Sequence, residues 1–304
     1  PATLAQTSGY FDPDTMMSIE EMQPGLRGVC RTVFQGSEIT EFNVEIVRVL
    51  RNFEGPAEMV LFRVLDGPLI DRTSSVPRGM SGSPLYFNGK LAGAASRAVG
   101  ITREPLAAFT PIEYMLECFD EMDRQSEMVE DATEVTSFYR LDEPLVLDGV
   151  ARSFAVDCAA SGSMPAVYSA QTLPLVPISM PLVLSGVPSK TVAQLSEILA
   201  PRGFDVMQGV TGSSDAPPYT VEAGSAIGIG LMTGDFSATG GGTITYVDGD
   251  RYLAFGHPMF GDGKVDLPAT YMDVADFVVQ DGDLAEKLLL PIDAEPMGSV
   301  TQDR

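Results

Sequence analysis

The chain has 304 residues, 44% of them hydrophobic, which is enough for one large domain or two ordinary ones. Its 42 acidic and 19 basic residues give a formal net charge of -23, which argues against nucleic acid as a partner because a polyanion would be repelled. A single histidine excludes H-E-x-x-H zinc sites and paired-histidine metal sites, and we expect neither a metal nor another cofactor.

Strands are expected at both ends of the chain. Runs of alternating or β-branched residues, bounded by turn residues, cover 29–34, 41–50 and 59–65 in the first part. Similar runs cover 226–232 and 243–247 in the last part. The sequence therefore predicts a mainly β protein.

Two dipeptides predict tight hairpins, because a type I′ turn needs positive φ at both central residues. Asn88-Gly89 joins expected strands over 84–87 and 90–95, and Asp248-Gly249 precedes an expected strand over 251–255. Each hairpin lies next to a candidate catalytic residue.

Two glycine clusters near the C-terminal end are interpreted as structural features and not as ligand-binding loops. Gly228 and Gly230 lack the spacing of a phosphate-binding loop, so we assign them to a closely packed strand. We interpret Gly240-Gly241-Gly242 as a three-residue turn.

Helices are expected at two places. Thr110-Pro111-Ile112-Glu113 has the pattern of a capping box with proline at the first helical position, and this helix should run to about Arg124. The acidic, polar stretch 123–134 then predicts a linker or solvated loop. A second helix begins after Ser189 and ends before Pro201, with an apolar face of Val192, Leu195, Ile198 and Leu199.

These elements divide the chain into three parts. Residues 1–127 form a β unit with a C-terminal helix, 128–215 an inserted mixed α/β module of unknown role, and 216–304 a second β unit. No uninterrupted run of 18 apolar residues occurs, so we expect no transmembrane helix. The chain opens at Pro1 without a signal-peptide pattern, and we expect an exported protein whose signal peptide is absent from this chain.

The hexapeptide Gly79-Met80-Ser81-Gly82-Ser83-Pro84 carries the main chemical signal. A serine nucleophile needs flanking glycines so that a substrate carbonyl can approach the backbone. We expect Ser81 to be the nucleophile and the N–H groups of Gly79 and Ser81 to form the oxyanion hole. The hexapeptide is not a G-x-S-x-G elbow, because its fifth residue is Ser83. A plain loop rich in serine and glycine is the alternative interpretation.

His257 is the candidate general base. It follows an expected strand in the segment LAFGHP, at a strand end where clefts commonly open, and the alternative is a hydrogen-bonded structural histidine. A triad also needs a carboxylate that holds the imidazole tautomer. Asp66, directly after the strand at 59–65, is the candidate for this role, and it competes with Asp71, Asp262 and Asp266.

Several stretches together resemble the SpoIVB peptidase family, trypsin-like serine peptidases named for a signalling protease of bacterial spore formation. Its serine-bearing half is similar to residues 25–51, 77–95 (PRGMSGSPLYFNGKLAGAA) and 109–116 (FTPIEYML). Its histidine-bearing segment is similar to 224–260, which includes AFGHP, and the strand region beyond it to 296–304 (PMGSVTQDR). The resemblance covers a little over half of the chain.

The resemblance implies a trypsin-like double β-barrel with Ser81 as nucleophile, His257 as base and Asp66 as orienting acid. In the sporulation enzyme the histidine segment precedes the serine segment, so the order here implies a circular permutation. The PDZ module of that enzyme has no recognisable counterpart in this sequence. The chain stops at Arg304, in a segment that is interior in the family, and we expect self-cleavage near that residue.

The sequence thus predicts a serine endopeptidase that hydrolyses polypeptides, including its own chain, through an acyl-enzyme. Two alternatives remain open. One is a noncatalytic β-domain scaffold or binding protein that keeps the motifs as packing features, and the other is a small-molecule esterase that uses the same triad.

Overall fold

The structure is a computed structural model, and it describes residues 8–54, 58–99, 102, 104–124, 137–158, 169–200, 204–209, 214–261, 263–279 and 285–304. Most of the expected linker at 123–134 and the competing aspartate Asp262 lie outside these residues.

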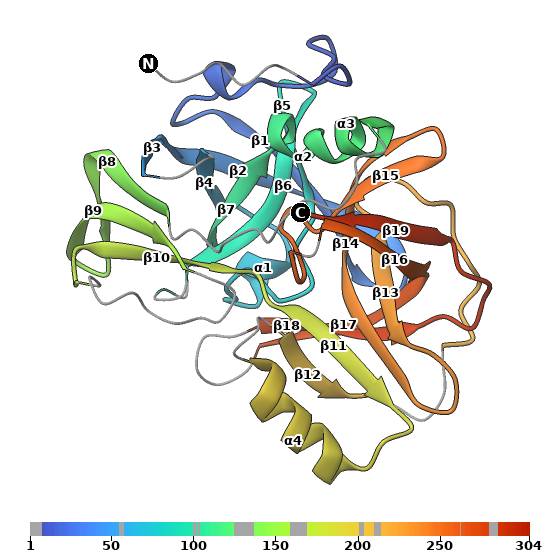
Figure 1. Cartoon of the computed structure of the whole chain (residues 1–304). Coiled ribbons are helices and arrows are strands. Elements are labelled where there is room, and N and C mark those ends of the chain that lie inside the picture. The colour runs from blue at the N-terminus through green and yellow to red at the C-terminus, as the bar shows by residue number, and fades with distance from the viewer. Residues whose placement is uncertain are drawn as a thin grey trace.

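A closed barrel forms the first part of the molecule. Six strands pair in a ring, each antiparallel to both neighbours. In ring order they are β1 (Arg27–Gln35), β2 (Glu38–Leu50), β4 (Met59–Val64), β7 (Leu106–Pro111), β6 (Lys90–Val99) and β5 (Pro84–Phe87). This barrel confirms the prediction of a mainly β, trypsin-like fold, and Figure 1 shows it in blue to green.

Alternating side chains fill the barrel, as the period of two along each strand requires. Phe42, Val44 and Ile46 of β2 are buried in one cluster with Phe62 of β4 and Phe109 of β7. The intervening side chains on the outer face pack in a second cluster, with strands that follow later in the chain. The barrel is therefore covered on one side.

The covering strands come from the first half of the expected module. They are β8 (Ser137–Leu147), β9 (Val150–Asp157) and β10 (Thr172–Pro177), and β10 pairs with β6 of the barrel. The short strand β3 (Asn52–Glu54) pairs with β8 at the edge of this ten-stranded sheet.

A second set of sheets forms the remainder of the described chain. A seven-stranded sheet contains β11 (Met180–Ser185), β12 (Phe204–Gln208), β13 (Ala226–Met232), β14 (Ser237–Asp248), β15 (Arg251–Ala254), β16 (Gly263–Thr270) and β19 (Gly298–Asp303). A separate hairpin consists of β17 (Met272–Val279) and β18 (Ala285–Pro291).

The strands of the expected module at 128–215 thus join both sheets, β8 to β10 on one side and β11 and β12 on the other. Only residues 178 and 179 separate β10 from β11, so this connection crosses directly between the two units, as Figure 1 shows in yellow-green.

The helices correct part of the sequence interpretation. The expected helix from Thr110 to Arg124 is divided into α2 (Ile112–Met115) and α3 (Glu117–Arg124), and its capping box is absent. Thr110 belongs to β7, and its hydroxyl bonds Ser96 Oγ and Gly256 O instead of capping a helix. The second expected helix is α4 (Ser189–Leu199), although Ile198 is 58% exposed and does not belong to its buried face. The short α1 (Pro68–Asp71) and the 3₁₀ helix η1 (Ile19–Glu21) were not expected.

Two turn predictions also need correction. Gly240-Gly241-Gly242 lies inside β14 and is not a turn. Glycine is needed at these positions because a Cβ would lie 2.4, 2.1 and 2.3 Å from side-chain atoms of Met180, Leu289 and Phe255. The glycines let those side chains pack on the strand. The hairpin near Asp248 turns at Gly249 and Asp250, because Asp248 pairs with Arg251, whereas the Asn88-Gly89 hairpin has the expected positive φ at both residues.

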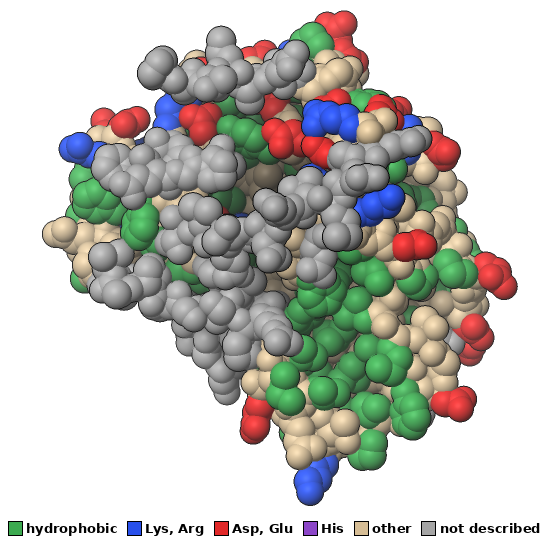
Figure 2. All heavy atoms as spheres, in the orientation of Figure 1, with side chains coloured by type: hydrophobic (Ala, Val, Ile, Leu, Met, Phe, Trp, Pro, Cys, Tyr) green, Lys and Arg blue, Asp and Glu red, His purple; other side chains and the backbone are tan. Residues whose placement is uncertain are grey.

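On the face in Figure 2, hydrophobic side chains gather over β11 and the far ends of β13 and β14, while carboxylates lie mainly around the rim. Within the described residues we find no helix long and apolar enough to cross a bilayer.

Candidate active site

Ser81 lies in a tight turn just before β5. Gly79 and Gly82 on either side of it have φ of 83° and 91°, a region that other residues rarely adopt. A Cβ on Gly82 would lie 2.0 Å from Thr243 O and 2.4 Å from the backbone nitrogen of Phe255. Glycine is required here because the turn touches the backbone of β14 and of the segment that follows β15.

This contact brings the two candidate catalytic segments together. Thr243 N donates to Ser81 O at 2.9 Å, and Thr245 Oγ1 donates to Gly82 O at 2.7 Å. Gly82 is adjacent to Ser81 in the chain, and Phe255 precedes His257 by two residues. The strands that lead to His257 therefore pack against the unit that carries Ser81.

Two peptide groups of the turn have a bonded carbonyl and an unbonded N–H group. Arg78 O accepts from Lys287 N at 3.1 Å, and Met80 O accepts from Ser83 N at 2.9 Å. Because a trans peptide directs its N–H opposite to its C=O, the N–H groups of Gly79 and Ser81 point away from these donors. Neither of the two N–H groups has an acceptor among the described residues, so both are available for a developing oxyanion.

The hydroxyl of Ser81 is unsatisfied. Ser81 is fully buried, and its Oγ has no hydrogen-bond partner within the part of the chain that the structure describes. A buried hydroxyl without a partner costs free energy, and in native proteins such a group calls for an explanation.

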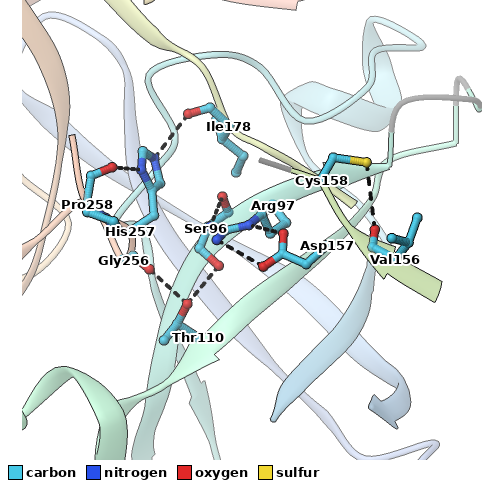
Figure 3. Close-up of polar contacts among 10 residues, drawn as sticks. All are labelled: Ser96, Arg97, Thr110, Val156, Asp157, Cys158, Ile178, Gly256, His257 and Pro258. Carbon is cyan, nitrogen blue, oxygen red and sulfur yellow. Dashed lines mark hydrogen bonds and ion pairs between the residues drawn. The ribbon is translucent and has the colours of Figure 1, made fainter. Parts of the chain in front are cut away.

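The segment that carries His257 makes a sharp bend after β15. Phe255 has φ of 67°, which is uncommon for a bulky residue, and Gly256 has φ of 72°. Gly256 packs on β6, because its Cβ would lie 3.0 Å from Ala94 Cβ, and its carbonyl accepts from Thr110 Oγ1 at 2.8 Å (Figure 3). The barrel strands β6 and β7 therefore fix the position from which the imidazole projects.

Both ring nitrogens of His257 lie against backbone carbonyls. Nδ1 is 2.9 Å from Pro258 O, and Nε2 is 3.2 Å from Ile178 O in the connection between β10 and β11 (Figure 3). A neutral imidazole has one N–H and one lone pair, so it donates to only one of these carbonyls. The lone pair of the other nitrogen then faces an oxygen that cannot donate.

The ring is neutral at physiological pH. Burial, assisted by the nearby Arg97 guanidinium, lowers the pKa of His257 to about 4, and the two carbonyls raise it only in part. Arg97 itself is held by Asp157, with Nε to Oδ1 at 2.7 Å. An imidazole of this kind is in the form that can accept a proton.

The contacts expected within the triad are not made in this structure. Ser81 Oγ is not bonded to His257, whose two nitrogens are occupied by carbonyls. Asp66 is exposed at the end of β4, and its carboxylate accepts from Asn43 N at 2.7 Å and from Asn43 Nδ2 at 2.5 Å instead of from the imidazole. The competing Asp71 and Asp266 are also exposed.

Asp303 is a site residue that the sequence analysis missed. Its carboxylate accepts from the N–H groups of Met259, Phe260 and Gly261 at 2.6, 2.7 and 3.1 Å, so it holds the loop directly after His257. Nothing in the sequence pattern near residue 303 marks this role, because the three donors are more than 40 residues away.

Two cavities meet at His257. One of about 510 Å³ is lined largely by apolar side chains, including Ile229, Leu253 and Met297, and one of about 400 Å³ is lined by Glu58, Arg97 and Tyr139 among others. His257 and Arg304 line both, whereas Ser81 lines neither. Substrate bound in these cavities would thus meet the imidazole first.

The described residues contain no group of three or more His, Cys, Asp or Glu side chains placed to hold a metal ion.

Comparison with known proteins gives one family. Residues 10–105 match the model of the SpoIVB peptidase S55 family, and this match supports the family indicated by the sequence motifs. It includes Asp66, Gly79 and Ser81 but not His257. No curated protein and no solved structure matches the chain.

Proposed function

We propose that this chain, whose residues 10–105 match a serine peptidase family, is an endopeptidase in which Ser81 is the nucleophile and His257 the general base. Ser81 Oγ attacks the scissile carbonyl while His257 takes its proton, and the resulting anion is held by the N–H groups of Gly79 and Ser81. His257 then protonates the leaving amine, and water hydrolyses the acyl-enzyme by the same route.

One observation carries this proposal: two complementary groups on touching segments are both unsatisfied. Ser81 Oγ is a buried donor without an acceptor among the described residues, and His257 has a lone pair that faces a carbonyl instead of a donor. A bond between the two would satisfy both. Because Gly82 touches Phe255, the two side chains project from adjacent segments, and we propose that the imidazole turns from Ile178 towards Ser81 to form this bond.

Asp66 is the acid that we propose for the triad, with Asp71 as the competing carboxylate. To act on the imidazole, the Asp66 carboxylate must exchange Asn43 for a ring N–H. Asp66→Asn should then lower kcat by about 10³- to 10⁴-fold by favouring the wrong tautomer. An equal loss in Asp71→Asn with little loss in Asp66→Asn would transfer the role to Asp71.

The proposal is tested by labelling with a fluorophosphonate and by hydrolysis of unstructured polypeptides. Wild type and the surface control Ser189→Ala should label and cleave, while Ser81→Ala and His257→Ala should lose about 10³-fold or more of the turnover. Each variant is also checked by circular dichroism to show that it folds. Undiminished labelling of Ser81→Ala would refute the assignment.

A noncatalytic scaffold is the second candidate, and the burial of Ser81 outside both cavities favours it. It predicts that the fluorophosphonate does not label the wild type and that the wild type hydrolyses no substrate. A small-molecule esterase would hydrolyse activated esters but leave polypeptides intact, so the same assay separates all three functions.

We also propose self-processing near Arg304, because this residue lines the same two cavities as His257 and its guanidinium lies 3.6 Å from Glu121. A reporter domain fused after Arg304 should be released in the wild type and retained in Ser81→Ala. Release in both would assign the cleavage to another protease. The circular permutation and export from the cytoplasm are likewise parts of the proposal.

A further inference from the structure

Lys287 of β18 is an amine buried where the two units meet. It is fully buried, its Nζ donates to Thr32 Oγ1 of β1 at 2.7 Å, and it lies 5.9 Å from the centre of the Phe34 ring. Among the described residues no carboxylate pairs with this amine, which is unusual for a buried lysine because transfer of a charge into the interior costs free energy unless it is compensated. The mechanism described above makes no use of this group.

The acceptor of this amine belongs to a cluster of buried hydroxyls beneath the Ser81 turn. Thr32 Oγ1 also accepts from Ser83 Oγ at 2.9 Å, and Ser83 belongs to the turn itself. Thr243 Oγ1 lies 3.4 Å from Ser83 Oγ and donates to Gly79 O at 3.2 Å. The cluster therefore bonds both ends of the turn, with Ser81 between them.

The backbone of Lys287 acts on the turn as well. Its N–H donates to Arg78 O at 3.1 Å, and Arg78 N donates to Ala285 O at 2.9 Å, so β18 pairs with the segment that enters the turn. Arg78 O and Gly79 N belong to one peptide plane. The bond from Lys287 thus sets the direction of the Gly79 N–H, which would otherwise be able to turn inward.

Side-chain packing fixes the same register. A Cβ on Gly79 would lie 3.3 Å from Lys287 Cβ and 3.4 Å from Lys287 Cδ, so the aliphatic stem covers the glycine. The amine then anchors the end of that stem on β1. The backbone bond, the stem and the amine all hold β18 against residues 78 and 79.

We infer that Lys287 is a positioning residue for the oxyanion hole, acting on the Gly79 N–H through Arg78 O and on the Ser81 turn through Thr32 and Ser83. This inference rests on the proposed function, since it assigns a role to a residue that would not touch substrate.

The charge of Lys287 adds an electrostatic effect. Burial lowers its pKa to about 7, and the Cys30 thiol of β1 is the titratable group that faces it. Burial raises the pKa of Cys30 to about 12, so this thiol is uncharged at neutral pH. Glu286 precedes Lys287 in the chain, and Arg78 O accepts from the backbone N–H of Lys287. The side chains of Arg78 and Glu286 form an ion pair at 3.9 Å, and Arg78 also pairs with Asp205. On the side of β14, the residue of the hydroxyl cluster is Thr243, which carries no charge that could act on the amine.

A protonated Lys287 therefore favours a developing anion at the turn, and its deprotonation removes that charge. Activity should fall as pH rises through about 7, which is well separated from the histidine pKa of about 4. The resulting pH profile would have its optimum between these two values.

The test compares kcat and KM between pH 4 and 9 for wild type, Lys287→Met and Lys264→Met, an exposed lysine control on β16. Lys287→Met keeps the stem over Gly79 but removes the charge. It should lower kcat by about 10- to 100-fold with little change in KM and abolish the fall in activity near pH 7. A wild-type value of kcat with an unchanged alkaline limb would overturn the inference.

A second variant and a second measurement cover other outcomes. Thr32→Val removes the acceptor of the amine without a large change in volume, and it should also lower kcat. This variant therefore tests the inference if Lys287→Met fails to fold. Amide exchange of Gly82 and Ser83, followed by NMR, is independent of activity and should be about tenfold faster in Lys287→Met than in Lys264→Met. If the wild type is inactive but exchange responds, the proposed function fails and the positioning role stands. Unchanged exchange removes that role.

Discussion

At the scale of single residues, the site is defined by groups whose hydrogen bonds are incomplete. Buried polar groups are normally paired, because an unsatisfied donor or acceptor loses its water without compensation. Ser81 Oγ and one nitrogen of His257 depart from this rule on adjacent segments. A purely structural serine and histidine would be expected to settle into satisfied positions, so the mismatch favours a site that completes its bonds when substrate binds.

The low pKa of His257 has a consequence for stability that does not depend on activity. In the unfolded chain the imidazole takes up a proton near pH 6.5, whereas in the folded chain it does so only near pH 4. The unfolded state binds more protons in that window, so stability is lost as pH falls through it, by up to about 3 kcal/mol.

Urea unfolding of wild type and His257→Gln at pH 7, 6, 5 and about 4.5 measures this effect. The difference between the two proteins isolates the effect of the histidine from that of carboxylates such as Glu117. Burial raises the pKa of Glu117, so its protonation adds stability as pH falls. Parallel stability curves for the two proteins would show that the imidazole is not buried as described.

At the scale of elements, the contact between the Ser81 turn and β14 depends on the absence of a side chain at residue 82. A Cβ there would overlap the carbonyl oxygen of Thr243 and the backbone nitrogen of Phe255, neither of which can rotate away. The left-handed φ of Gly82 adds strain for any other residue. The turn and the His257 segment must therefore separate if this glycine is replaced.

Gly82→Ala should lower the free energy of unfolding by about 3 kcal/mol or more, by combining steric overlap with backbone strain. Gly298→Ala is the matched control, because its Cβ would meet only Tyr252 Cε1 at 3.8 Å. Urea unfolding of both variants measures the difference. Equal stability of the two variants would mean that the turn does not pack on β14 as described.

Local patterns predicted elements well where neighbours agree with them. The strands at 226–232 and 84–87 have the expected bounds, because alternation and turn residues act over a few residues. The prediction of a turn at 240–242 was wrong, since the strand conformation of these glycines depends on side chains from three distant segments. Thr110 was misread for the same reason, because the acceptor of its hydroxyl is 146 residues away.

The candidate site shows the same division. Ser81, Gly79 and His257 could be named because they stand in short motifs, and the structure shows that their segments touch. Asp303 and Lys287 stand in no motif, and their partners are fixed only by the tertiary fold. The orientation of the imidazole was also beyond prediction, because it depends on Ile178 in the connection between the two sheets.

At the scale of the whole molecule, the net charge of -23 sets the field that any substrate meets. A cleft in a strongly acidic protein attracts cations over roughly a Debye length, about 10 Å at 0.1 M salt. Basic polypeptides should therefore associate faster than acidic ones, and added salt should reduce that difference.

Matched peptide substrates test this field. A peptide with about three added lysines should lose several-fold in kcat/KM between about 20 and 500 mM sodium chloride, while one with about three added glutamates should gain. A neutral peptide with the same cleavage site corrects for general effects of salt. Identical salt dependence for all three would mean that the surface charge does not act on substrate binding.

The contacts beneath the Ser81 turn also bear on how the protein is made. All six barrel strands lie between residues 27 and 111, so a barrel can close early on the ribosome. The partner of Gly79 at Thr243 is 164 residues later, and that of Thr32 at Lys287 is 255 residues later. At about 5 to 20 residues per second, some 10 s or longer pass between the synthesis of Ser81 and that of these partners. A nascent chain therefore carries Ser81 without the groups that hold its turn, and that turn can be completed only after most of the chain has been made.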